Sequence, residues 1–115
     1  MVTVYGINNC STVKKALAWL KERGVEHAFH DFRKDGTDAE RLAAWADALG
    51  WETLLNRRAP SFRKIPDEEK ADLDRGRALA LMQAYPNIIK RPVVETDGTV
   101  LTVGFDAARY EELFG

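Results

Sequence analysis

The sequence predicts one α/β domain, and three observations lead to that prediction. The chain has 115 residues, 45% of them apolar, which suits one hydrophobic core and leaves little room for a second. Runs rich in β-branched residues alternate with helical patterns at the start of the chain, and two further β-rich runs lie near its end. A single cysteine excludes an intramolecular disulfide, so the core alone has to stabilise the fold.

The first strand is expected at residues 2–7, where a short β-rich run begins directly after the initial methionine. The run stops at Asn8-Asn9, two residues whose side chains favour turns. Cys10 comes next, at the point where a helical pattern takes over. The sequence therefore places Cys10 at the joint between a strand and a helix.

A helix follows this joint and leads to a second strand. Ser11 or Thr12 can cap the helix, and Gly24 is expected to close it. Its apolar residues recur every three or four positions, as on one face of a helix. These positions are Val13, Ala16, Leu17 and Leu20. Residues 25–32 then form the second β-rich run.

The middle of the chain begins with a turn and a well-defined helical pattern. Lys34-Asp35-Gly36 is expected to turn the chain. Thr37 and Glu40 have the spacing of a capping box, in which each side chain bonds a backbone N–H of the other. The apolar stripe that follows runs up to Gly50 and consists of Leu42, Trp45, Ala46 and Leu49.

Shorter elements are expected after Gly50. Residues 51–56 predict a short helix and residues 57–65 a basic loop. Pro66 opens an acidic segment that suits the first turn of a helix. A further helical stripe ends at Pro86, because the residue before a proline disfavours helical backbone angles. This stripe consists of Ala78, Leu81, Met82 and Tyr85.

The end of the chain predicts a β-hairpin and a helix. Residues 91–95 and 100–103 are β-rich runs on either side of Asp97-Gly98, a pair that favours tight hairpin turns. Asp106 can cap a last helix through its carboxylate.

The order of these elements is β-α-β, a series of helices, and then β-β-α. This order is typical of a thioredoxin-like fold with a helical insertion between the second and third strands. We expect one domain over residues 1–115, with its core at about 1–35 and 86–115 and the insertion at about 37–85.

Charge and hydropathy exclude several classes of protein. A formal net charge of −1 argues against a cationic surface for nucleic acid or anionic lipid. No apolar run approaches the roughly 20 residues of a membrane span. The first residues lack the basic start and apolar run of a secretory signal. We therefore expect a cytoplasmic monomer without nucleic-acid or membrane partners.

Cys10 is the candidate reactive residue. A thiol reacts as its thiolate, and the free N–H groups and dipole at a helix start lower its pKa from about 8.5. Lys14 and Lys15, one turn inside the helix, would add positive potential. A buried structural role is the alternative, since it is the common fate of a lone cysteine. Val13 stands where a C-x-x-C protein has its second cysteine, so an adduct on Cys10 would need a thiol from outside.

The sequence offers no convincing metal site. His27 and His30 are three residues apart in a predicted strand, which directs their side chains to opposite faces. With only Cys10 besides them, they cannot complete a zinc set. We expect no metal and no tightly bound cofactor.

Three separate stretches resemble the ArsC-like family. They are Val-Tyr-Gly-Ile-Asn-Asn-Cys-Ser-Thr-Val-Lys-Lys-Ala at 4–16, Trp-Glu-Thr-Leu-Leu-Asn-Arg-Arg at 51–58, and Asn-Ile-Ile-Lys-Arg-Pro-Val-Val at 87–94. The family contains glutaredoxin-coupled arsenate reductases, Spx transcription regulators and YffB-type proteins. The chain is most similar to the YffB-type branch.

The resemblance implies roles for particular residues. Cys10 would be the nucleophile and Arg91 an arginine that binds an oxyanion. Pro92 would be the proline, often cis, that lies beside the cysteine. Arg57 or Arg58 would supply a second anion-binding arginine, and the sequence leaves open which of the two. Guanidinium groups suit both roles, because they pair with tetrahedral anions and carboxylates and would hold a nearby thiol ionised.

The residues around Cys10 complete the candidate site, and two departures from the family limit its chemistry. Asn9, Ser11, Thr12 and Lys14 are further candidates for binding the substrate or its anionic groups. Arsenate reductases of the family have a histidine shortly before the cysteine, and this chain has none there. They also have an arginine after the last strand, where Gly104-Phe105 stands here. Thiol exchange is therefore a better expectation than arsenate reduction.

Two functions follow as hypotheses. The first is a glutathione-dependent thiol reductase that acts on a small oxidised or anionic substrate. Glutathione is then the cosubstrate, and glutathione or glutaredoxin resolves the adduct on Cys10. The alternative is an Spx-like regulatory protein that binds RNA polymerase.

Overall fold

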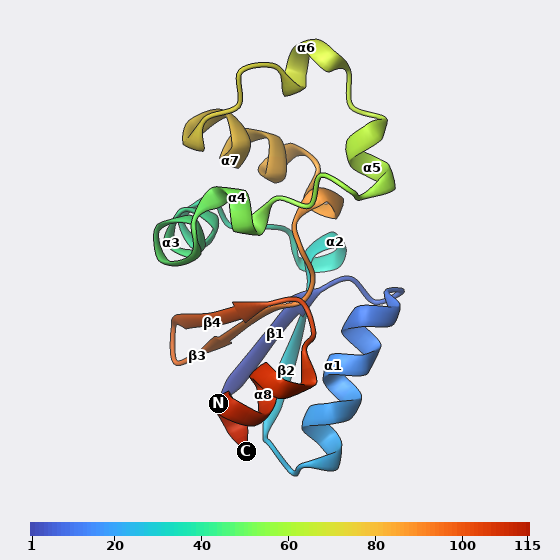
Figure 1. Cartoon of the computed structure of the whole chain (residues 1–115), viewed down its shortest axis with the longest axis vertical. Coiled ribbons are helices and arrows are strands. Elements are labelled where there is room, and N and C mark those ends of the chain that lie inside the picture. Colours follow the sequence, from blue (N-terminus) through green and yellow to red (C-terminus); the bar gives the residue numbers. More distant parts are fainter. The chain divides into compact units, whose positions relative to one another are not determined.

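The computed structural model describes all 115 residues, apart from the side chains of Arg33 and Asp35. A four-stranded sheet has the order β2-β1-β3-β4 (Figure 1). β1 runs parallel to β2 and antiparallel to β3, and β3 runs antiparallel to β4. The strands are β1 (Val2–Gly6), β2 (His27–Asp31), β3 (Val93–Thr96) and β4 (Thr99–Val103). The carboxyl ends of β1 and β2 and the amino end of β3 therefore lie at the same edge of the sheet.

The helices confirm the predicted thioredoxin-like arrangement, with a helical insertion between β2 and β3. The helices that belong with the sheet are α1 (Ser11–Glu22), α2 (Phe32–Asp35) and α8 (Ala107–Phe114). The insertion contains α3 (Ala39–Leu49), α4 (Trp51–Leu54), α5 (Pro60–Arg63), α6 (Asp67–Lys70), α7 (Arg75–Ala84) and the 3-10 helix η1 (Pro86–Ile88). None of these helices combines the length and apolar composition that crossing a bilayer requires.

The chain divides into two compact units. The sheet unit contains residues 1–35 and 91–115, and the helical unit contains residues 36–90. Residues 86–90, expected with the sheet, belong to the helical unit. Ile89 forms an isolated antiparallel bridge with Leu55, and the Lys90 N–H donates a 2.7 Å hydrogen bond to the Leu54 carbonyl. These backbone pairs hold the end of the insertion to its beginning.

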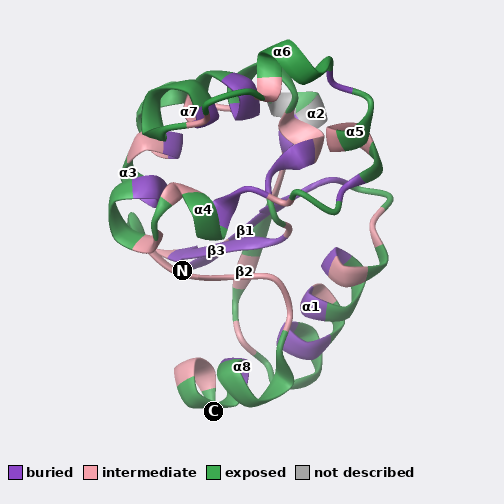
Figure 2. Ribbon diagram, turned by 45° about the horizontal axis from the view of Figure 1, so that its top comes forward, coloured by how far each residue is buried: buried purple, intermediate pink, exposed green. Residues whose placement is uncertain are grey.

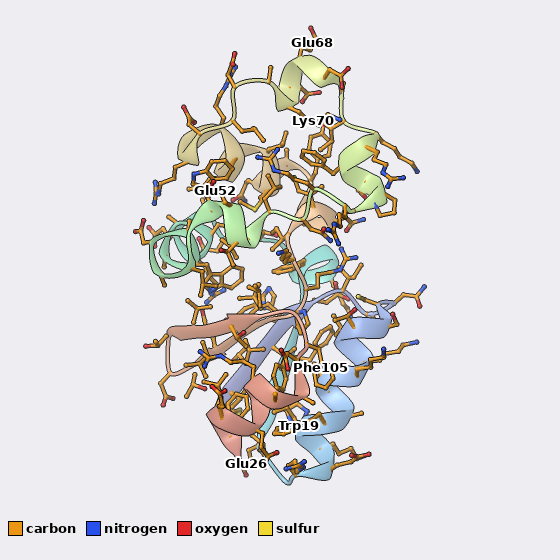
Figure 3. The ribbon with its side chains drawn as sticks, in the orientation of Figure 1. Trp19, Glu26, Glu52, Glu68, Lys70 and Phe105 are labelled. Carbon is orange, nitrogen blue, oxygen red and sulfur yellow. The ribbon has the colours of Figure 1, made fainter. Side chains whose placement is uncertain are left out.

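The core of the sheet unit lies between one face of the sheet and the helices α1 and α8. It consists of Val2, Val4, Ala16, Trp19, Leu20, Val94 and Tyr110. Figure 2 shows the buried residues along β1 and β3 and on the inner side of α1. Trp19 and Phe105 both pack into this core (Figure 3). The Tyr110 hydroxyl donates to the Gly104 carbonyl at 2.9 Å, so the one polar atom of this buried ring has a partner.

The helical unit has its own apolar interior. α3 packs against α4 and α7, and α7 packs against η1. The residues that these helices bury include Leu42, Trp45, Leu54, Ala78, Leu81, Met82 and Ile88. The predicted apolar stripes of α3 and α7 therefore supply most of the interior of this unit, although Tyr85, predicted in the second stripe, follows the end of α7 and is exposed.

The ends of two helices differ from the prediction. Cys10, rather than Ser11 or Thr12, is the N-cap of α1. Asp38, rather than Thr37, caps α3, because its carboxylate accepts a 3.0 Å hydrogen bond from the Glu40 N–H. An aspartate one residue further along takes the capping role that the spacing of Thr37 suggested.

The second strand is shorter than predicted. The Val25 N–H donates to the Leu20 carbonyl at 3.0 Å, so Val25 closes α1 instead of starting β2. Gly24 has a φ of +68°, the left-handed conformation that commonly ends a helix. Phe32 opens α2, where the chain was expected to remain extended. The expected basic loop contains α5, which has Pro60 in its first turn.

The hairpin and the last helix are confirmed. Asp97 and Gly98 have φ angles of +50° and +82°, as a type I′ turn requires of both central residues. The Asp106 carboxylate accepts hydrogen bonds from the N–H groups of Ala108 at 3.0 Å and Arg109 at 3.4 Å.

Candidate active site

Cys10 and Arg91 lie at the same edge of the sheet because β1 and β3 run antiparallel. β1 ends at Gly6, and Tyr5 pairs with Val93 at the start of β3. The loop after β1 therefore reaches Cys10 near the segment that precedes β3. In that segment the peptide bond between Arg91 and Pro92 is cis.

Gly6 allows α1 to begin close to the end of β1. A Cβ atom at Gly6 would lie 2.7 Å from Cγ2 of Val13, a separation that real Cβ atoms essentially never show. Val13 is only 1% exposed, so its side chain has little room to move. The absence of a side chain at Gly6 thus fixes where the first turn of α1 lies.

Backbone amides and a guanidinium group surround the sulfur of Cys10. Cys10 has extended backbone angles, and its carbonyl accepts a 3.0 Å hydrogen bond from the Lys14 N–H. The thiol is half-buried, and it forms no capping hydrogen bond with the first turn of α1. The backbone N–H groups of Val13 and Thr12 and the side chain of Arg91 nonetheless favour the ionised form of the sulfur.

These donors determine the acidity of the thiol. Burial is the largest single influence on Cys10, and it raises the pKa because it disfavours the charged thiolate. The Val13 N–H, the Arg91 side-chain donor, the Thr12 N–H and the positive charge of Arg91 each lower the pKa, in decreasing order. Together they outweigh burial, so the pKa of Cys10 lies below its ordinary value. More of the thiol is then present as the nucleophilic thiolate at neutral pH.

The other residues predicted beside Cys10 lie around the same loop and helix start. Ser11 and Lys14 are exposed at the beginning of α1, and Thr12 is half-buried. Asn9 is exposed and lines a polar pocket of about 340 Å³ together with Asn8, Asp31 and Lys34. Asn8, Asp31 and Lys34 were not predicted as site residues, although Asp31 ends β2 and the other two follow the ends of β1 and β2.

Arg57 and Arg58 lie in the helical unit, where they line a pocket of about 510 Å³ with Leu55, Asn56 and Lys90. The Asn56 carboxamide oxygen accepts from the Arg58 N–H at 3.1 Å, which shapes the loop. Among the side chains that the structure describes, no carboxylate forms an ion pair with Arg57, Arg58 or Lys90. Lys90 was not predicted as a site residue, although it directly precedes Arg91 in one of the three stretches. The action of Arg57 or Arg58 at Cys10 stays a prediction.

The two histidines do not form a site together. The Nδ1 of His27 lies 2.8 Å from the Val25 carbonyl oxygen, and the ring of His30 lies 4.9 Å from that of Tyr5. Among the described side chains, no group of three or more His, Cys, Asp or Glu could hold a metal ion.

The fold is a thioredoxin-like sheet in which a cysteine of lowered pKa starts α1 and an arginine precedes a cis-proline before β3. The sequence model of the ArsC family matches residues 5–113, and the chain belongs to this family.

Several known proteins are similar to this chain over nearly its whole length. A solved protein called YFFB is 44% identical, covers 100% of both chains and superposes with a TM-score of 0.95. The solution structure of an arsenate reductase (ArsC) related protein from Brucella melitensis is 47% identical, covers 98% of this chain and 93% of the other, and has a TM-score of 0.77. An uncharacterized protein of Haemophilus influenzae is 42% identical over 114 residues, 99% of each chain.

A regulator is a more distant relative. The global transcriptional regulator Spx 1 of Lactococcus lactis is 27% identical over 108 residues, which cover 92% of this chain and 83% of that protein. The relatives of this chain therefore include a protein named as related to an arsenate reductase and a protein named as a transcriptional regulator.

Proposed function

We propose that the chain is a thiol-dependent reductase in which Cys10 is the nucleophile and glutathione resolves the adduct. The observation that carries the proposal is the environment of the Cys10 sulfur. Donors from Val13, Thr12 and Arg91 lower its pKa despite burial. A cysteine with only a structural role has no need of such donors, whereas a nucleophilic cysteine does.

The reaction can be written as two thiol–disulfide exchanges. The Cys10 thiolate attacks the glutathione sulfur of a mixed disulfide, forms a Cys10–glutathione disulfide, and releases the substrate as a thiolate that takes a proton from water. A second glutathione, as its thiolate, attacks the glutathione sulfur of that adduct. Oxidised glutathione leaves and the Cys10 thiolate returns. The two steps sum to an exchange in which the substrate sulfur goes from disulfide to thiol and the sulfur of the incoming glutathione goes from thiol to disulfide, so no other reductant is needed.

The chain has no second thiol that could resolve an adduct on Cys10. Cys10 is its only cysteine, and position 13 holds a buried valine. Glutathione or glutaredoxin therefore has to supply the second thiol. The cytoplasm, which the sequence analysis expects as the location, keeps such thiols reduced.

Arginines would bind the anionic groups of the substrate. Arg91 already acts on the Cys10 sulfur, and its guanidinium has five N–H donors, enough to hold a substrate anion as well. Arg57, Arg58 and Lys90 line a pocket without ion pairs among the described side chains, which suits an anion. We expect one of the two arginines to take part in turnover.

A coupled assay tests the proposal. Glutathione, glutathione reductase and NADPH are combined with either arsenate or the mixed disulfide of glutathione and 2-mercaptoethanol, and NADPH oxidation is followed. We expect turnover of the mixed disulfide by the wild type and none by Cys10→Ser. Thr99→Ala, which removes an exposed hydroxyl at the start of β4, serves as the control variant and should retain the Cys10 thiol and the turnover. Absence of turnover with both substrates, together with ordinary alkylation of Cys10, would overturn the proposal.

A regulatory role is the second candidate, and the similarity to Spx 1 favours it. Spx-type regulators often use a C-x-x-C switch, and Val13 takes the place of its second cysteine here. A pull-down with the purified α subunit of RNA polymerase distinguishes the two roles. A stoichiometric complex that persists with Cys10→Ser would favour the regulator, and no complex would favour the reductase.

A further inference from the structure

A hollow with an apolar floor lies between α6 and α7 in the helical unit (Figure 1). We call this hollow the α7 groove. Its lining consists of Glu69, Arg77, Ala80, Leu81, Ala84 and Tyr85. The volume of about 230 Å³ lies below the roughly 300–1,000 Å³ of small-molecule pockets. The α7 groove therefore suits side chains of another protein surface better than a whole small molecule.

α7 has apolar residues on the side that borders the groove as well as on its buried side. It buries Ala78, Leu81 and Met82 in the helical unit. Ala80 and Ala84 are exposed, and the tyrosine that follows the helix is 36% exposed. A helix with one free face normally presents charged and polar residues there. The side of α7 beside the groove is therefore typical of a helix that a second surface covers.

Glu69 and Arg77 supply one charge of each sign to the α7 groove. The Tyr85 hydroxyl donates a 3.3 Å hydrogen bond to the Glu69 carboxylate, and the negative charge of this carboxylate raises the pKa of Tyr85. Nη1 of Arg77 donates to the Ala71 carbonyl at 3.0 Å. Among the side chains that the structure describes, neither Glu69 nor Arg77 forms an ion pair. The groove therefore suits a partner that presents one positive and one negative charge.

A second copy of α7 presents this combination of charges. Helices rise about 1.5 Å per residue, so Arg77 and Tyr85 are about 12 Å apart along the axis of α7. An antiparallel α7 with a two-fold axis beside Leu81 brings Arg77 of one copy level with Tyr85 of the other. Since Tyr85 bonds Glu69, each Arg77 then lies at the end of the groove that holds the partner's Glu69. The contact forms twice, because a two-fold interface is self-complementary.

We propose that the α7 groove binds α7 of a second copy of the chain, with Arg77 of each copy paired to Glu69 of the other. Two helices of 10 residues bury less than the roughly 1,200 Å² of a stable interface, so we expect a weak dimer with a dissociation constant of about 0.1–1 mM. At low concentration the chain then remains the monomer that the sequence predicts. The inference is independent of the proposed function, because it does not involve Cys10 or its donors.

Sedimentation equilibrium of the full chain tests the dimer. The concentration is varied from about 20 µM to about 2 mM, a range that brackets the expected constant. A reductant is present, so that no disulfide joins two Cys10 thiols. We expect the average mass to rise from that of one chain toward that of two. A mass that stays at that of one chain up to the highest concentration would overturn the proposal.

Charge reversals test the pairing of Glu69 with Arg77. Glu69→Arg and Arg77→Glu each place like charges opposite one another, and each should weaken dimerisation roughly five- to tenfold. An equimolar mixture of the two variants should associate as strongly as the wild type, because every contact again joins opposite charges. Glu68→Arg and Lys64→Glu are the controls, since both side chains are exposed and lie outside the groove lining, as Figure 3 shows for Glu68 on α6. Both controls should associate like the wild type.

The remaining outcomes locate the interface. If both charge reversals associate like the wild type, the copies meet through another surface and the proposal fails. If the folded variants and their mixture all lose association, Glu69 and Arg77 do not pair and the proposal fails as well. Far-UV circular dichroism reports the folding of each variant. Independently of any variant, the wild-type backbone amide signals of residues 76–85 should shift with concentration, and shifts confined to other residues would overturn the proposal.

Discussion

The sheet unit and the helical unit place their polar groups in different ways. In the sheet unit, the groups that lower the pKa of Cys10 are two amides of the first turn of α1 and one arginine that precedes β3. In the helical unit, Arg57, Arg58 and Lys90 line one pocket and, among described side chains, have no ion-pair partner. The difference teaches that backbone position largely sets the surroundings of the Cys10 thiol, whereas side-chain charge sets the character of the pocket in the helical unit.

The largest effect is expected where the sheet unit has no room for a side chain. In Gly6→Ala the new Cβ would meet Cγ2 of Val13 at 2.7 Å, and the buried valine cannot withdraw. We expect the free energy of unfolding to fall by about 1–3 kcal/mol, the usual cost of overpacking a core. The pKa of Cys10 should rise, because the Val13 amide moves with the helix start. Urea unfolding and pH-dependent alkylation measure the two effects.

The helical unit offers the matched control for this change. Gly76 lies in the first turn of α7. Outside the backbone of the helix itself, the nearest atom to a Cβ at this position would be Oδ1 of Asp74, at 3.7 Å. Gly76→Ala should leave stability unchanged or raise it by up to about 1 kcal/mol, since alanine favours helix over glycine. Equal losses in the two variants would contradict the special role of Gly6.

Removing the guanidinium beside Cys10 should have the next largest effect. Arg91→Gln removes a charge and leaves only a weaker donor, so the pKa of Cys10 should rise. The alkylation rate at neutral pH should then fall about two- to tenfold. Arg91→Lys should lie between this variant and the wild type, because it keeps the charge and loses the planar fork.

An arginine elsewhere in the sheet unit provides the comparison. Arg109 forms an exposed ion pair with Glu112 at 3.1 Å, and Arg109→Gln should leave the rate of Cys10 alkylation unchanged. If Arg91→Gln behaved in the same way, Arg91 would not be the residue that acidifies the thiol.

Anion affinity of the helical unit should change by a smaller factor. Arg57→Gln, Arg58→Gln and Lys90→Gln should each weaken phosphate binding about two- to fivefold, since each removes one exposed charge. Added salt should weaken binding further, because exposed charges are screened. NMR titration of the backbone amides of residues 55–58 with phosphate measures the affinity.

Two controls sharpen this test. Arg75 pairs with Asp47 at 2.9 Å, so Arg75→Gln should leave phosphate affinity unchanged. Cys10→Ser should also leave it unchanged if the helical unit binds anions by charge alone. Equal weakening by Arg75→Gln would show that phosphate binds through general charge rather than through this pocket.

The smallest expected effect is a pH dependence of stability. The pKa of Cys10 is lowered in the folded state, so the unfolded chain holds its proton up to a higher pH. The contribution of Cys10 to stability should therefore be absent below the folded pKa, grow as pH rises through the interval between the two values, and be complete above about 8.5, the unfolded value. Urea unfolding of wild type and Cys10→Ser across this interval measures it. A difference that stays constant with pH would contradict the lowered pKa.

Local signals made much of the fold predictable. The turn at Asp97-Gly98 and the cap at Asp106 depend on residues next to one another in the sequence, and both are confirmed. The start of α1 was predicted less well, because it depends on a contact between Gly6 and Val13 rather than on a capping hydroxyl. The predicted end of β2 was wrong, because Phe32 begins α2 and is buried there.

The residues of the candidate site also differ in whether the sequence could predict them. Cys10 and Arg91 could be named from a helix pattern and a family resemblance, and the cis bond before Pro92 agrees with that resemblance. Asp31 and Lys34 could not be named, because only the parallel pairing of β1 and β2 brings them beside Asn9. The Val13 amide was not predicted, because its effect on the pKa of Cys10 comes from its backbone position and not from its residue type.

The burial of Val13 also bears on how a disulfide on Cys10 could be released. Its side chain fills the space in front of Gly6, so the first turn of α1 holds apolar packing where a second thiol would otherwise lie. A disulfide formed on Cys10 would find no second thiol within the chain, so only a thiol from outside could release it.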